Sequence, residues 1–139
     1  MKQYLFDASA LIFLIKKANV PTTFQHLQNL FILDLTVYEM GNVLLKENRI
    51  TKFLTTHEIE TLEKVVQIVL SRTEKIINQD AVFQQILEIA KNEALSFYDS
   101  SYIYFAKKNN VQLVTEDQNL VEKAQKYVTS KTTKTLLSA

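Results

Sequence analysis

The sequence predicts an α/β fold with a parallel sheet that helices cover on both faces. Short apolar runs alternate along the chain with longer segments in which apolar residues recur at helical spacing. Strands that alternate with helices of this length are typical of parallel sheets buried between two helical layers. The chain has 139 residues, 47% of them apolar, and shows no repeat or linker. We therefore expect one domain over residues 1–139, with a tail from about residue 129.

Local signals place the expected elements along the chain. Thr36, Asp80 and Asp117 are residue types that favour helix N-caps, and Pro21 stands near the start of a short helical segment. The expected strands are residues 3–6, 30–33, 75–77, 111–115 and 127–128. The expected helices are residues 8–17, 22–27, 36–48, 55–70, 80–92, 99–108 and 117–126.

The composition excludes several kinds of site. The chain contains no cysteine, which excludes disulfides, thiolate metal sites and cysteine nucleophiles. With Gly41 as its only glycine it has no glycine-rich phosphate loop, and His26 and His57 have no partner at a catalytic spacing. The formal net charge of +1 favours no class of partner.

The N-terminal region is apolar as far as Ile15, but Asp7 interrupts it and no small-residue cleavage site follows. We interpret this region as a strand and a helix, not as a signal peptide. No apolar stretch approaches the length that spans a bilayer. We expect a cytoplasmic protein that does not associate with a membrane.

Four acidic residues are the candidate functional residues. Asp7 and Asp117 follow expected strands, and in open α/β sheets the ligand site lies beyond the carboxyl ends of the strands. Asp99 stands at the start of an expected helix, and Glu39 lies in the first turn of another. Taken alone, each aspartate is better explained as a helix cap or a solvated loop residue, and Glu39 as a surface residue of its helix. However, carboxylates embedded in apolar sequence are costly unless they are paired or bind a metal, so we predict that the four converge.

Four segments around these acids resemble the signature segments of PIN domains, in the same order and at similar separations. The segments are LFDASAL at 5–11, TVYEMGN at 36–42, YDSSY at 98–102 and LVTED at 113–117. The resemblance covers roughly residues 2–128. It implies a three-layer α/β/α sandwich with a central parallel sheet, and many PIN domains are metal-dependent ribonucleases. The compact size is most similar to the VapC-type toxins of toxin–antitoxin pairs.

The resemblance implies a metal site built from the acidic quartet Asp7, Glu39, Asp99 and Asp117. Carboxylates without nearby histidine or cysteine suit Mg²⁺ or Mn²⁺, which are hard cations that prefer oxygen ligands. We expect Asp7 and Asp99 to bind the metal directly, Asp117 directly or through water, and Glu39 to bind it or to position the attacking water. The supporting polar residues are Ser9, Asn42, Thr115 and Asn119. Many relatives have an aspartate where this chain has Asn119, which leaves a second metal open.

The expected substrate is RNA, held by basic clusters and by stacking on tyrosines. The candidate clusters are Lys16–Lys17, Lys46 with Arg49 and Lys52, Lys107–Lys108, and the lysines from Lys123 to Lys134. For each cluster a solvated helix end is an equally good interpretation. The expected protein partners are a small antitoxin and a second copy of the chain, with helix 55–70 as a candidate contact surface.

Three alternatives stay open at this stage. The chain could be an RNA-processing PIN nuclease outside a toxin pair, or an RNA-binding PIN module with weak or no catalysis. A phosphatase with Asp7 as nucleophile is disfavoured, because such enzymes usually carry a second aspartate two residues on and this chain has Ser9 there.

Overall fold

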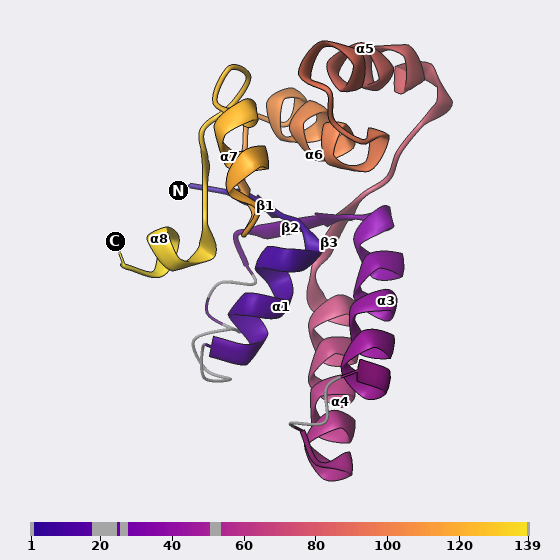
Figure 1. Cartoon of the computed structure of the whole chain (residues 1–139). Helices are drawn as coiled ribbons and strands as arrows, with labels where there is room; N and C mark the ends of the chain where they lie inside the picture. The colour runs from indigo at the N-terminus through magenta and orange to yellow at the C-terminus, as the bar shows by residue number, and fades with distance from the viewer. Residues whose placement is uncertain (1, 18–24, 26–27, 51–53, 139) are drawn as a thin grey trace.

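Five parallel strands form one sheet in the order β3-β2-β1-β4-β5 (Figure 1). The computed structural model describes residues 2–17, 25, 28–50 and 54–138. The strands are β1 (Tyr4–Phe6), β2 (Leu30–Leu33), β3 (Glu74–Ile76), β4 (Gln112–Val114) and β5 (Ser130–Lys131). The predicted parallel sheet is thus confirmed, whereas the predicted helix 22–27, with Pro21 before it, falls almost entirely outside the described residues.

The helices form a layer on each face of the sheet (Figure 1). One layer contains α5 (Phe83–Glu93), α6 (Phe97–Lys108) and α7 (Gln118–Ala124). The other contains α1 (Ala8–Lys17), α3 (Asp34–Ile50), α4 (Thr56–Arg72) and α8 (Thr133–Ser138). The three-layer α/β/α prediction is therefore confirmed.

The pleat of the strands explains why the core divides into two parts. Successive side chains of a strand point to opposite faces, so neighbours in the sequence pack in different layers. Leu5 and Leu113 belong to the cluster under α5 and α6, whereas Phe6 and Val114 belong to the cluster under α1 and α3. Because both faces are covered, β1 and β2 in the middle of the sheet are apolar throughout, whereas the edge strands β3 and β5 contain charged or polar residues.

The register of the central strands aligns their carboxyl ends. β1 pairs with β4 so that Phe6 lies opposite Val114, and the backbone N–H of Asp7 donates to the Val114 carbonyl at 3.2 Å. β2 lies on the other side of β1, with Leu5 opposite Phe31. The residues that follow β1, β2 and β4 therefore meet at one edge of the sheet, where the sequence predicts the functional site.

Several helices begin elsewhere than the sequence predicts. The α3 helix starts at Asp34, so the predicted N-cap Thr36 lies inside its first turn. The α6 helix starts at Phe97 with Ser96 as its N-cap. Asp80 begins a 3₁₀ turn, η1 (Asp80–Val82), that precedes α5. The predicted N-cap Asp117 is confirmed, since its side chain accepts hydrogen bonds from two backbone N–H groups of α7.

The predictions of a strand at 127–128 and of a tail from about residue 129 are wrong. The last strand is β5, and it pairs with β4 through the Leu113 N–H on the Thr129 carbonyl (2.9 Å) and the Thr115 N–H on the Lys131 carbonyl (3.1 Å). Thr133 is fully buried, and its backbone N–H donates to the Glu116 carboxylate at 2.6 Å. Hydrogen bonds hold the polar residues up to Thr133, which explains why hydrophobic periodicity did not reveal β5, and Leu136 and Leu137 of α8 pack against the core.

None of the helices in the described ranges is long and apolar enough to cross a membrane.

Removal of residues 129–139 should destabilise the chain measurably. The truncation leaves the buried N–H groups of Leu113 and Thr115 without acceptors, each costing about 1–3 kcal/mol. Urea denaturation should therefore show a loss of about 2 kcal/mol or more relative to the full chain. Removal of residues 138–139 alone is the control and should have little effect. Equal stability of the 1–128 chain and the full chain would contradict the structural role assigned to β5.

Candidate metal centre

Asp7 is the most tightly held of the predicted site residues. It is 7% exposed and lies between the end of β1 and the start of α1. Its Oδ1 accepts hydrogen bonds from the Ser9 hydroxyl (2.7 Å) and the Ala10 backbone N–H (2.9 Å). Its Oδ2 accepts one from the Thr115 hydroxyl at 2.5 Å. Three donors therefore fix the orientation of this carboxylate, and two of them are predicted supporting residues.

The partners of Asp7 also hold the loop after β4 in place. The backbone N–H of Glu116 donates to the Ser9 hydroxyl at 3.0 Å, and that of Asp117 donates to the Thr115 hydroxyl at 3.2 Å. Each hydroxyl thus accepts from this loop while it donates to Asp7. The position of the fourth acid is in this way coupled to that of the first.

Glu39 is held by a chain of hydrogen bonds that the sequence analysis did not find. The Tyr102 hydroxyl donates to Glu39 Oε1 at 2.5 Å and lies 2.6 Å from the Thr36 hydroxyl. The Thr36 hydroxyl in turn accepts from the backbone N–H of Leu33 at 3.1 Å. Since Tyr102 uses its proton on Glu39, Thr36 donates to Tyr102, and the chain runs from the end of β2 to the carboxylate.

Tyr102 and Thr36 position Glu39. Their three-residue spacing from an acid on the same helix is a sequence signal that could have identified them. Thr36 lies three residues before Glu39 on α3, and Tyr102 lies three residues after Asp99 on α6. Residues three apart share a helix face, so each lies on the same face of its helix as an acid, and the Tyr102 hydroxyl of α6 reaches Glu39 of α3. Burial and then the neighbouring Glu39 charge raise the pKa of Tyr102 well above its ordinary value, so the phenol remains a hydrogen-bond donor.

Asp99 lies in the first turn of α6 and is half-buried. Its backbone N–H donates to the Ser96 side chain at 3.0 Å, so Ser96 is the cap and the Asp99 carboxylate is not needed for that role. Burial raises the pKa of Asp99, and the negative charge of Asp117 raises it further.

Asp117 and the two asparagines are exposed. Asp117 Oδ1 accepts from the backbone N–H groups of Asn119 (2.9 Å) and Leu120 (3.3 Å), so this acid caps α7 through one carboxylate oxygen. Asn119 lies in the first turn of α7, and Asn42 lies on an exposed part of α3. Their predicted supporting roles remain predictions.

The acids interact electrostatically at the carboxyl edge of the sheet. Burial raises the pKa of Asp7, and the charge of Asp99 adds to the rise against the opposing effect of the Thr115, Ser9 and Ala10 hydrogen bonds. Burial likewise raises the pKa of Glu39, the Tyr102 hydrogen bond opposes the rise, and the charges of Asp7 and Asp99 add to it. Asp7, Glu39 and Asp99 are thus near enough for the charge of Asp99 to act on both other acids, and the charge of Asp117 acts on Asp99.

The oxygen-only donor set of this edge suits a hard divalent cation. Within residues 2–17, 25, 28–50 and 54–138, however, no three acidic or histidine side chains are close enough to surround one ion. Mg²⁺ is commonly held by one or two carboxylates and several waters, so this spacing fits a cation bound partly through water. His57 is exposed on α4, and His26 lies outside the described residues.

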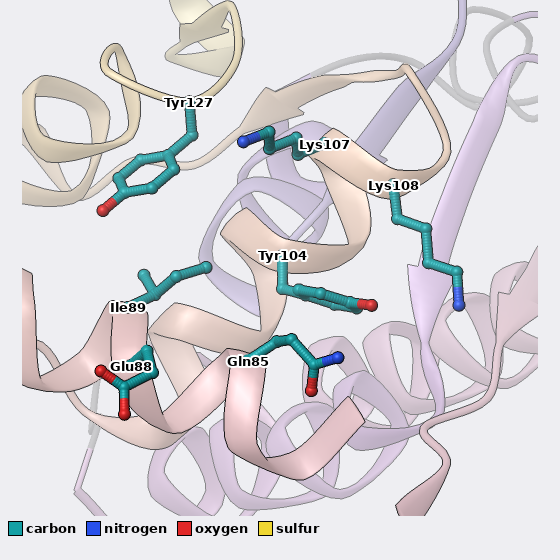
Figure 2. A pocket seen from close by; sticks show the side chains of 7 residues that line it. All are labelled: Gln85, Glu88, Ile89, Tyr104, Lys107, Lys108 and Tyr127. Atoms are coloured by element: carbon teal, nitrogen blue, oxygen red, sulfur yellow. The ribbon is translucent and has the colours of Figure 1, made fainter. Parts of the chain in front are cut away.

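A hollow of about 540 Å³ lies apart from the acids, near the carboxyl end of α6 (Figure 2). It is lined by Gln85, Glu88, Ile89, Tyr104, Lys107, Lys108 and Tyr127. The Lys107 Nζ lies 5.8 Å from the centre of the Tyr127 ring. The Lys108 Nζ lies 5.9 Å from the centre of the Tyr104 ring. Two further predicted basic residues are already paired, Lys16 with Glu47 and Lys126 with Glu93.

The fold and the acidic edge define a PIN domain. The model of the PIN domain family matches residues 4–126, and the chain belongs to this family. The chain is 36% identical over 121 residues to Exonuclease VapC9 of Pyrobaculum aerophilum, covering 87% of this chain and 85% of that protein. The predicted resemblance to PIN domains and VapC proteins is therefore confirmed.

Solved structures show the same fold. The crystal structure of PAE2754 from Pyrobaculum aerophilum superposes with a TM-score of 0.82 at 32% identity and covers 99% of this chain and 95% of that one. FitAcB from Neisseria gonorrhoeae superposes with a TM-score of 0.62 at 16% identity and covers 92% and 96%. FitAB, in a structure bound to an IR36 DNA fragment, gives a TM-score of 0.63 at 16% identity, with 94% and 95% covered.

Tyr102→Phe should destabilise the protein by about 1–2 kcal/mol, because the fully buried Thr36 hydroxyl loses its acceptor and Glu39 loses a donor. Chemical denaturation of the variant and the wild type measures the difference. Tyr4→Phe, at a half-buried tyrosine of β1, is the matched control. If both substitutions have the same effect, the hydrogen-bond chain does not stabilise the fold.

The metal-free protein should lose stability as the pH rises above the ordinary carboxyl pKa of about 4. The pKa values of Asp7, Glu39 and Asp99 are raised in the folded chain, so in this window the folded state binds more protons than the unfolded state. The free energy of unfolding then decreases with pH up to the raised pKa values. Asp7→Asn removes one of these groups and should raise the Tm in chelator at pH 8 more than at pH 5.

The control for this measurement is Asp80→Asn, at an exposed aspartate of η1. It should leave the difference in Tm between pH 5 and pH 8 as it is in the wild type. A pH dependence that Asp7→Asn leaves unchanged would show that burial of Asp7 does not destabilise the metal-free fold.

Proposed function

We propose that the protein is a Mg²⁺- or Mn²⁺-dependent endoribonuclease and the toxin of a toxin–antitoxin pair. The observation that carries the proposal is the set of buried or half-buried carboxylates of Asp7, Glu39 and Asp99 at the carboxyl edge of the sheet, where burial first and then neighbouring carboxylates raise the pKa of each. Carboxylates with raised pKa values that converge on one edge are typical of catalytic sites. Membership of the PIN family and the name of the relative VapC9 support a nuclease.

Each of the four acids has a separate role in the proposed reaction. Asp7 would be the most firmly oriented metal ligand, because three hydrogen bonds hold it, and Asp99 would be the second direct ligand, since its charge acts on Asp7. Asp117 keeps one oxygen on the helix cap, which suits a contact through water. A bound Mg²⁺ or Mn²⁺ would lower the pKa of a water molecule and offset the charge of the phosphoryl oxygens. Glu39, held through Oε1 by Tyr102, would orient that water and accept its proton.

Cleavage of a mixed RNA pool should require Mg²⁺ or Mn²⁺ and should fall about 100-fold or more in Asp7→Asn and Asp99→Asn. Glu88→Gln, at an exposed carboxylate of α5, is the matched control and should cleave like the wild type. Thermal unfolding provides a second readout, since Mn²⁺ should raise the Tm of the wild type more than that of Asp7→Asn.

A circular RNA substrate distinguishes the mode of cleavage, which matters because the relative is named an exonuclease. Cleavage of the circular RNA supports the proposed endonuclease. Cleavage of linear RNA alone would show that the protein acts only at free RNA ends. Equal cleavage by the wild type and both acid variants would overturn the metal mechanism. Stabilisation by Mn²⁺ without cleavage of any RNA would indicate an RNA-binding module.

We also propose two protein partners, namely a small antitoxin and a second copy of the chain. The name of the VapC relative supports the antitoxin. For self-association the observation is the exposed apolar surface on the adjacent helices α3 and α4, where Leu45 is 47% and Ile68 is 43% exposed. A neighbouring gene for a small DNA-binding protein whose product inhibits cleavage would support the toxin role over an RNA-processing role.

A further inference from the structure

The six tyrosines of the chain fall into two groups by exposure. Tyr38 is 77% and Tyr98 is 60% exposed, far more than the other four. Tyr102 is buried, and the remaining three, Tyr4, Tyr104 and Tyr127, are half-buried. An exposed aromatic ring gains nothing from the hydrophobic effect, so the two exposed tyrosines are not explained by the stability of the fold.

The two exposed tyrosines directly precede two of the candidate acids. Tyr38 is followed by Glu39 on α3, and Tyr98 is followed by Asp99 on α6. The hydroxyl of Tyr102, three residues after Asp99 on α6, donates to Glu39 Oε1 at 2.5 Å, so the starts of the two helices that carry these acids are close in space although 60 positions separate the acids in the sequence. Among the described aromatic residues, the two most exposed rings therefore belong to the residues next in sequence to two of these acids.

The two tyrosines approach this edge from opposite faces of the sheet. α3 packs in the layer with α1 and α4, and α6 packs in the layer with α5 and α7 (Figure 1). The hydrogen bonds of Tyr102 with Thr36 and Glu39 join the start of α3 to α6 across the edge. Each of the two layers thus contributes one exposed tyrosine from the first turns of a helix that also carries an acid.

Neither ring is engaged within the part of the chain that the structure describes. No hydrogen bond is formed there by the hydroxyl of Tyr38 or Tyr98, and neither ring stacks on another aromatic side chain. By contrast, the exposed Phe83 ring packs against Phe97, with 5.1 Å between the ring centres. Both tyrosine rings are free to stack on a bound molecule.

We propose that Tyr38 and Tyr98 form a stacking subsite for unpaired nucleobases on the two sides of the phosphodiester that lies at the acids. The inference rests on the proposed ribonuclease function and deepens it, because it selects single-stranded RNA as the substrate. Every base has a π-face, so stacking on tyrosine binds single strands with little preference for sequence. It also provides affinity without positive charge next to carboxylates, which repel the RNA backbone.

The positions of Tyr38 and Tyr98 favour RNA over a protein as the bound partner. A protein interface is centred on a continuous apolar patch, whereas these two rings are separated by the acidic edge. A single strand laid across that edge presents a phosphate to the acids and a base to each ring.

Fluorescence anisotropy with short oligonucleotides in chelator tests the subsite, because nothing is cleaved without metal. The substitutions Tyr38→Leu and Tyr98→Leu keep apolar bulk and remove the aromatic face. Each should weaken binding of an oligoadenylate about 10-fold. Tyr38→Phe and Tyr98→Phe should bind like the wild type, since stacking needs the ring and not the hydroxyl. Phe83→Leu, at an exposed aromatic residue without a neighbouring acid, is the matched control.

An abasic oligonucleotide of the same length and charge isolates the contribution of the bases. The wild type should bind it as weakly as the leucine variants do. Equal affinity of wild type and leucine variants for the oligoadenylate, or an equal loss on the abasic strand, would overturn the subsite. A change in molecular mass of the leucine variants by light scattering would assign the rings to contact with a second protein instead.

The outcomes separate this inference from the proposed function. Metal-dependent cleavage that both leucine variants retain, with unchanged oligonucleotide affinity, overturns the subsite alone. Stacking-dependent binding without metal-dependent cleavage overturns the nuclease and leaves the subsite. A wild type that binds no single strand overturns the subsite whatever its activity.

Discussion

The hydrogen bonds on the buried Asp7 carboxylate are the interaction on which the candidate site depends. Ser9 and Thr115 donate to Asp7 and accept from the loop after β4, so one carboxylate connects β1, α1 and β4. These donors oppose the cost of burying a negative charge but do not remove it, because the pKa of Asp7 is still raised. The site therefore combines a fixed geometry with unfavourable electrostatics.

That combination explains the layout of the rest of the edge. Glu39 and Asp99 are half-buried near Asp7, and their charges add to the repulsion. Tyr102 and Thr36 hold Glu39 in this unfavourable position from opposite layers of the sandwich. An arrangement that is rigid and electrostatically strained without a cation is what a site preorganised for a divalent metal requires.

The C-terminal segment shows how distant parts of the chain support this edge. β5 accepts the Thr115 N–H, and Glu116 accepts the Thr133 N–H. Thr115 therefore has its backbone fixed by the last strand and its side chain fixed on Asp7. A segment of serine, threonine and lysine thus becomes part of the core through hydrogen bonds, a role that apolar patterning does not reveal.

The sequence by itself determined the alternation of strands and helices, the parallel sheet and the order of the acids, because these follow from hydrophobic periodicity and short local motifs. It also located Ser9 and Thr115, which lie two residues from acids. Only the tertiary structure decided that Tyr102 reaches Glu39 across 63 residues, that β5 closes the sheet, and that Tyr38 and Tyr98 are exposed. These features depend on packing between segments that are far apart in the sequence, and local sequence patterns do not encode such contacts.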